Sequence, residues 1–122
     1  MDSKFYVSLE AARLLKEKGY RQAYHAYYFG NSNLRKGGYG GDSWYDSPDF
    51  YPAPTKAEAI DWLESKGIII ELSVTHDLCH WVFSIYMKGG EEILTNTDFD
   101  CEYFPTRLAA KDAAIIKTLE LL

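Results

Sequence analysis

Two stretches of the chain repeat one pattern of hydrophobic and polar positions, which predicts a capped helix, a stopping glycine and a strand. In the first stretch, Ser8 precedes apolar positions spaced three and four residues apart. In the second, Thr55 and Glu58 have the spacing of a capping box. Serine and threonine accept bonds from the free N–H groups of a helix start, and a following glycine ends a helix readily. We therefore expect helices over residues 9–18 and 56–66.

Alternating apolar residues predict four strands. β-branched and aromatic residues in alternation are typical of half-buried strands. The first two strands are expected over 22–29 and 68–75, the third in the run from Cys79, and a short fourth over 92–95 after a Gly-Gly turn. The inner face of the third strand is expected to comprise Cys79, Trp81, Phe83, Ile85 and Met87.

The last apolar stripe of the chain predicts a closing helix over residues 106–121. The resulting order is α-β-loop-α-β-β-β-α, which is typical of the α+β class. We expect one domain over 1–122, in two layers, with three helices on one face of an antiparallel sheet of about four strands. Strand order stays open because a long connection precedes the second helix.

That connection, Gly30 to Pro54, holds five of the nine glycines and three of the four prolines, so we expect it to be irregular. Long irregular loops are uncommon in compact domains and are often functional. Aromatic rings are costly to leave in water, so those of the loop should pack on the domain, on a second copy or on a ligand. All three alternatives remain open.

We favour a protein partner or a second copy of the chain, contacted through the loop and the aromatic strand before it. A homodimer is one form that this contact could take. The residues predicted to bind the partner are Tyr39, Trp44, Tyr45, Phe50, Tyr51, Tyr27 and Tyr28.

Composition and charge argue against several classes of protein. The net charge of −5 is uneven, because residues 1–54 carry seven basic and six acidic side chains whereas residues 55–122 carry six and twelve. An acidic half repels nucleic acid. Two cysteines are too few for a disulfide framework, and no apolar run suits a signal peptide or a membrane span. We expect a cytoplasmic protein that does not contact membranes.

Sequence motifs for catalysis and cofactor binding are incomplete. Gly38 begins a G-x-G-x-x-S run, but no helix pattern follows to bind a pyrophosphate. No phosphate loop or G-x-S-x-G nucleophile elbow occurs. We expect no cofactor and no catalytic residues.

One segment has residue types that bind metals. It contains His76, Cys79 and His80, but adjacent strand residues point to opposite faces, so only the two histidines could converge. A third ligand would have to be Cys101 or an acidic residue. The alternating carboxylates of 98–102 are interpreted as a solvated acidic edge. We expect no metal site, and a metal-dependent enzyme is the least favoured function.

The strand before the loop supports a different hypothesis. Its rings could stack on the bases of a single-stranded nucleic acid, with basic side chains nearby. The rings are Tyr24, His25, Tyr27, Tyr28 and Phe29, and the cations are Arg21, Arg35 and Lys36. The acidic balance of the chain makes this the alternative function rather than the favoured one.

Two resemblances concern the origin of the chain. The run from Tyr6 to Leu15 resembles the first helix of excisionase-type winged helix-turn-helix proteins, but no recognition helix follows it. The layout as a whole is similar to small uncharacterised proteins of gut Bacteroidetes and their phages. The shared elements are a Ser-Leu-Glu-x-Ala start, a Tyr-x-Ala-Pro-Thr middle, matched here from Tyr51 to Leu63 with Pro52 before Ala53, and an Ala-rich closing helix. This resemblance implies a mobile-element or phage origin and no particular activity.

Overall fold

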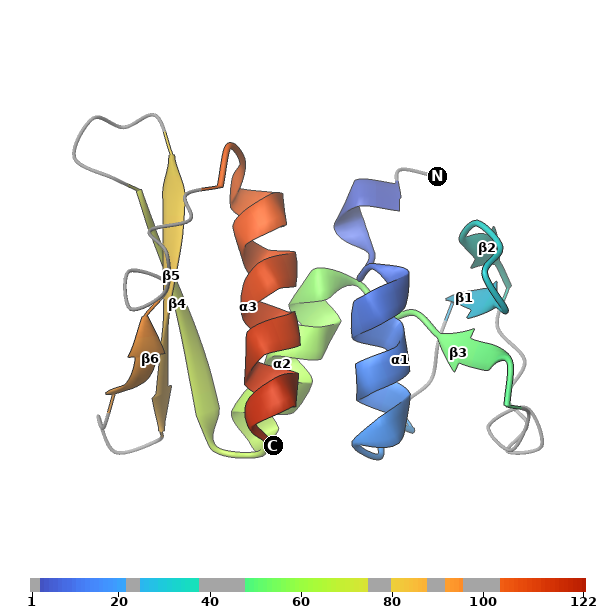
Figure 1. Ribbon diagram of the computed structural model, residues 1–122, viewed down its shortest axis with the longest axis horizontal. Helices are drawn as coiled ribbons and strands as arrows, with labels where there is room; N and C mark the ends of the chain where they lie inside the picture. Colours follow the sequence, from blue (N-terminus) through green and yellow to red (C-terminus); the bar gives the residue numbers. More distant parts are fainter. Residues whose placement is uncertain (1–2, 22–24, 38–47, 75–79, 88–91, 96–103) are drawn as a thin grey trace.

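The helices of the chain lie between two sheets (Figure 1). The structure, a computed structural model, describes residues 3–21, 25–37, 48–74, 80–87, 92–95 and 104–122, with the backbone alone for 3 and 92–95. Its elements in chain order are η1 (Ser3–Phe5), α1 (Leu9–Glu17), β1 (Ala26–Phe29), β2 (Arg35–Lys36), β3 (Phe50–Pro52), α2 (Lys56–Ser65), β4 (Ile68–Val74), β5 (Trp81–Met87), β6 (Glu92–Thr95) and α3 (Arg107–Leu121).

The helices begin and end close to where the sequence predicts. The Ser8 side chain accepts a bond from the backbone N–H of Ala11 at the start of α1. At the start of α2, Thr55 and Glu58 form both bonds of a capping box. Gly19 and Gly67 follow the two helices with φ of 93° and 87°, the left-handed conformation that glycine adopts without strain. The capped pattern therefore sets both helices.

The strands pair antiparallel throughout, as expected, and the α+β class is confirmed. The short sheet has the order β2-β1-β3, and the long sheet has the order β4-β5-β6. In the short sheet Tyr28 lies opposite Tyr51. In the long sheet Ile70 lies opposite Ile85.

The structure differs from the expected two layers in having two sheets in place of one sheet of about four strands. The segment 30–54, expected to be irregular, contributes β2 and β3 to the short sheet. The backbone N–H of Val7 donates to the carbonyl oxygen of Pro54 at 3.1 Å, which ties the end of this segment to the start of α1. Helix α1 contacts β3 on one side and α3 on the other, so β1 pairs beside α1 and away from the long sheet (Figure 1).

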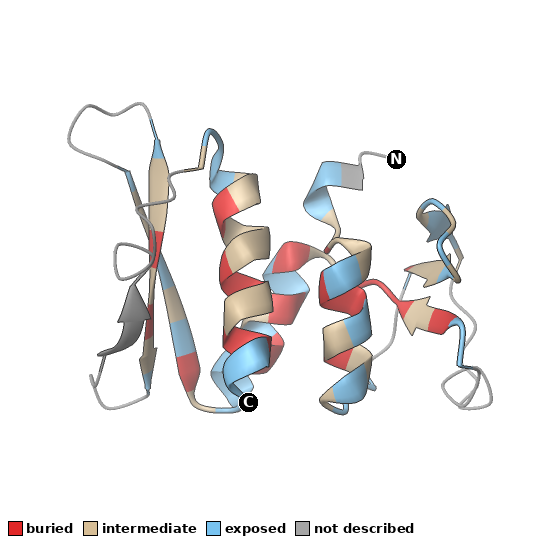
Figure 2. Cartoon of the chain, in the orientation of Figure 1, coloured by how far each residue is buried: buried red, intermediate tan, exposed pale blue. Residues whose placement is uncertain are grey.

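The main core lies where the helices meet one another and the short sheet (Figure 2). Its buried residues are Val7, Ala11, Ala12, Leu15, Tyr20, Ala26, Ala53, Ala59, Trp62, Leu63, Ile115 and Leu119. On the predicted inner face of β5, Phe83 and Ile85 are buried, Trp81 is half-buried, and Met87 is 42% exposed at the strand end. Cys79 lies outside the described residues.

Candidate functional site: the outer surface of the short sheet

Helix α1 anchors the short sheet by hydrogen bonds to its strands. The Tyr28 hydroxyl of β1 donates to the carbonyl oxygen of Val7 at 2.8 Å. The Lys16 ammonium of α1 donates to the carbonyl oxygen of Phe50 in β3, also at 2.8 Å. Hydrogen bonds from charged donors are stronger than neutral ones. Two strands of the sheet are thereby fixed to one helix.

Tyr51 is held between cations. Its ring centre lies 5.4 Å from the Arg13 guanidinium and 5.2 Å from the Lys16 ammonium, within the range of cation–π attraction. Its hydroxyl donates to the carbonyl oxygen of Pro48 at 2.9 Å. Arg13 also donates to the Asn31 side-chain oxygen at 2.6 Å, which ties the turn after β1 to the same helix. The Tyr51 ring and both cations are therefore engaged in contacts within the chain.

The residues predicted to bind a partner therefore fall into separate groups. Tyr39, Trp44 and Tyr45 lie outside the described residues. Tyr28 and Tyr51 face α1 and make the contacts given above. On the opposite face of the sheet, Phe50 is only 2% exposed and packs on Tyr27, with ring centres 5.3 Å apart. Of the described residues in this set, Tyr27 keeps its place on the outer face of the sheet with part of its ring open to solvent.

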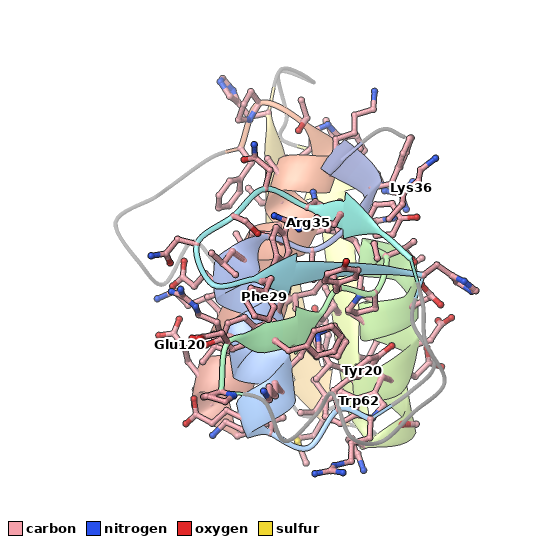
Figure 3. The ribbon with its side chains drawn as sticks, turned by 90° about the vertical axis from the view of Figure 1, so that its right-hand side faces the viewer. Tyr20, Phe29, Arg35, Lys36, Trp62 and Glu120 are labelled. Atoms are coloured by element: carbon pink, nitrogen blue, oxygen red, sulfur yellow. The ribbon has the colours of Figure 1, made fainter. Side chains whose placement is uncertain are left out.

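Two other side chains accompany Tyr27 on the solvent side of the sheet. Phe29 is 45% exposed and shares a strand face with Tyr27, because side chains alternate along β1. Arg35 of β2 lies opposite Tyr27 and shares its face, whereas Lys36 lies opposite the buried Ala26 and points to the other face at the sheet edge; both side chains are exposed. Figure 3 looks onto this side and labels Phe29, Arg35 and Lys36. We call Tyr27, Phe29 and Arg35 the docking surface.

The predicted set of partner-binding residues omitted most of the docking surface, although one signal in the sequence was available. The period-two alternation of a strand places Phe29 with Tyr27. No comparable signal identifies β2, because Arg35 and Lys36 are only two residues and carry no apolar alternation. The pairing of β2 with β1 in the folded chain fixes Arg35 beside the two rings.

A partly buried polar cluster joins the starts of α1 and α2 to α3. The Asp112 carboxylate accepts a bond from the backbone N–H of Ser8 at 2.9 Å. Burial and, to a smaller degree, the negative charge of Asp112 raise the pKa of Tyr28. Lys56 is 8% exposed, and burial lowers its pKa, an effect that Asp112 partly offsets. Asp112 satisfies a backbone N–H group at the start of α1, and Tyr28 and Lys56 lie within range of its charge. We therefore interpret the cluster as structural.

The candidate metal ligands are not brought together in the described part of the chain. His76, Cys79, Cys101 and the acidic run 98–102 lie outside it, and His80 is exposed at the start of β5. Among the described residues, no three histidine, cysteine or acidic side chains are placed to hold a metal ion.

Comparisons with family models, with curated proteins and with solved structures gave no match to this chain. In the parts of the chain that the structure describes, no helix has the length and apolar character needed to cross a membrane. The case for a function therefore depends on the surface chemistry described above.

Proposed function

We propose that this chain is a protein-interaction domain that binds a second copy of itself through the docking surface. The observation that carries the proposal is the exposure of Phe29, which is 45% open to solvent on a strand fixed to the body of the molecule. Partner contacts depend mostly on a few aromatic and arginine side chains. A rigid exposed ring beside Arg35 has this chemistry.

The edge strand β2 supports contact through side chains rather than through added strands. β2 has β1 as a neighbour on one side, and its two residues both carry exposed cations. Short edge strands with charged side chains disfavour pairing with another strand. The proposed contact therefore uses the tip of Arg35 and the ring of Phe29.

A single-stranded nucleic-acid accessory protein is the second candidate. The observation in its favour is that Tyr27 and Phe29 share a strand face with Arg35 directly opposite Tyr27, since exposed rings beside cations can stack bases and neutralise phosphates. The net charge of −5 counts against it. Titration with a labelled oligonucleotide at low salt separates the two candidates, because binding that weakens steeply with salt would favour this one.

The expected biological setting follows the resemblance to small proteins of gut Bacteroidetes and their phages. A mobile-element or phage origin, and a role through protein contact rather than catalysis, complete the proposal.

The first prediction concerns Phe29→Ser. Removing an aromatic anchor from an interface weakens binding by about tenfold or more. We expect the wild-type chain to gain mass with concentration in sedimentation velocity and the variant to need about tenfold more protein for the same gain.

The matched control is Phe5→Ser, because Phe5 is 50% exposed on η1, outside the docking surface. It should associate like the wild type. A wild-type chain that stays at its monomer mass of 14.0 kDa at every concentration would refute self-association.

A further inference from the structure

Strand β4 forms an open edge of the long sheet. In the order β4-β5-β6, β5 is the one strand that pairs with β4 among the described residues. In an antiparallel pair only every second residue exchanges backbone hydrogen bonds with the neighbouring strand. One of the two alternating sets of β4 residues therefore directs its backbone N–H and C=O groups away from β5, toward the open edge.

The bonds of Trp81 in β5 identify that set. Its backbone N–H donates to the carbonyl oxygen of Phe104 at 2.8 Å, and the backbone N–H of Phe104 donates to the carbonyl oxygen of Trp81 at 3.0 Å. Both groups of Trp81 thus point away from β4, so the residues of β5 that bond to β4 are every second one from Val82. The β4 residues opposite these are Ile69, Glu71 and Ser73.

The other residues of β4 direct their backbone groups to the open edge. These are Ile68, Ile70, Leu72 and Val74. Within the described part of the chain, no hydrogen-bond partner meets the backbone groups of these four residues. The edge therefore presents a row of unpaired N–H and C=O groups.

β4 lacks the features that normally protect a sheet edge. It has seven residues, whereas the other edge strands β2, β3 and β6 have two, three and four. Proline, lysine and bulges protect edges, but β4 contains no proline or lysine and pairs regularly with β5. Its side chains Ile69 and Val74 are 42% and 40% exposed. An unprotected edge of this length accepts another strand.

We infer that β4 of a second copy pairs antiparallel with this edge about a two-fold axis and joins the two long sheets into one. An extended backbone is the partner that a row of unpaired N–H and C=O groups binds, and β4 of another copy presents the same row. The inference goes beyond the proposed function, because the docking surface lies on the short sheet, on the other side of the helices (Figure 1).

The charge of Glu71 selects the register of the two strands. If they overlapped completely, Glu71 would lie directly opposite Glu71 of the second copy, where like charges repel. A shift that places Leu72 opposite Leu72 brings Glu71 opposite Ser73 instead, and a serine hydroxyl donates to a carboxylate. The same shift covers Val74 with Ile70 of the second copy, whereas a shift in the opposite direction would leave Val74 exposed.

The variant Val74→Pro tests the backbone contact. Proline lacks the N–H that Val74 directs to the open edge, and the pairing with β5 does not use this group, so the change suits an edge strand. The contact loses one hydrogen bond at each end, and association in sedimentation velocity should be about tenfold weaker than in the wild type. The matched control Val74→Ile keeps the N–H and an apolar side chain, and it should associate like the wild type.

A change of charge tests the register. Ser73→Glu places a carboxylate opposite Glu71 of the other copy, and association should be about fivefold weaker. Adding Glu71→Lys to this variant makes the facing charges opposite in sign and should restore association. Circular dichroism of every variant checks folding, and the two charge variants still test the contact if Val74→Pro unfolds.

The outcomes separate this contact from the proposed function. If folded Val74→Pro and Ser73→Glu match the wild type while Phe29→Ser is weakened, the β4 contact is wrong and the docking surface stands. If the β4 variants are weakened and Phe29→Ser is not, the β4 contact stands and the docking surface is wrong. Weakening in all three supports both contacts.

Two further results would overturn the β4 contact as described. A weakened Ser73→Glu that Glu71→Lys does not restore contradicts the register. A wild type that is a monomer at every concentration refutes both proposals. Protection of its Ile70 and Leu72 amides from hydrogen exchange by an added peptide of alternating threonine and valine would then assign the edge to a strand of another protein.

Discussion

Some side chains of the short sheet anchor it to the rest of the molecule, and others are exposed to solvent. Tyr28 and Tyr51 point toward α1 and make hydrogen bonds or cation–π contacts inside the molecule. Phe29, on the opposite face of β1, leaves 45% of its surface in solvent. Because the anchors fix the strand, the exposed ring loses little conformational freedom when it binds, which favours its use in a contact.

The prediction at the scale of one residue concerns the stability of the variant Tyr28→Phe. The change removes the bond from the hydroxyl to the carbonyl oxygen of Val7, and a net loss of about 1 kcal/mol in the free energy of unfolding is expected near pH 7. Burial raises the pKa of Tyr28 above the ordinary value of 10.0. The unfolded state therefore loses this proton first as the pH rises.

The stability that Tyr28 contributes is accordingly complete below pH 10 and decreases as the pH rises through the raised pKa of the folded state. The difference between the wild type and Tyr28→Phe should shrink above pH 10. Urea unfolding of both proteins at several pH values measures it. A difference that grows at high pH would contradict the assignment.

Helices and strands differ in how far the sequence determines them. The caps of α1 and α2 are local, since Ser8 and the pair Thr55 and Glu58 lie within three residues of the groups they satisfy. The sequence therefore predicts both helices closely. Strand pairing depends on residues far apart, and nothing local signals that Tyr28 lies opposite Tyr51.

The sequence likewise determines only part of the candidate site. Alternation along β1 separates Tyr27 and Phe29 from Tyr28, so the sequence could indicate which rings face out. The position of Arg35 depends on the pairing of a two-residue strand.

Thr55→Ala gives the prediction at the scale of one helix. The Thr55 hydroxyl accepts a bond from the backbone N–H of Glu58 at 3.1 Å, and its loss leaves that donor without its cap. We expect the free energy of unfolding to fall by about 1 kcal/mol. Thr55→Ser keeps the acceptor and should stay close to the wild type in the same denaturant titration. Equal losses in both variants would argue against the capping box.

At the scale of the whole molecule, the arrangement of layers separates the surfaces. Helices α2 and α3 pack against the long sheet, and α1 supports the short sheet on the other side (Figure 1). The structure thus presents the docking surface on the side of the short sheet that faces away from α1. One self-complementary surface is enough for two identical copies to associate about a two-fold axis.

Cross-linking between copies tests this account most directly. Equal amounts of unlabelled and ¹⁵N-labelled chain are mixed, treated with a carbodiimide that joins an amine to a carboxylate at zero length, and digested for mass spectrometry. We predict linked peptides of mixed isotope content, because amines and carboxylates near a contact between two copies are joined across it. The absence of every mixed-isotope link, with links inside single copies formed, would contradict self-association.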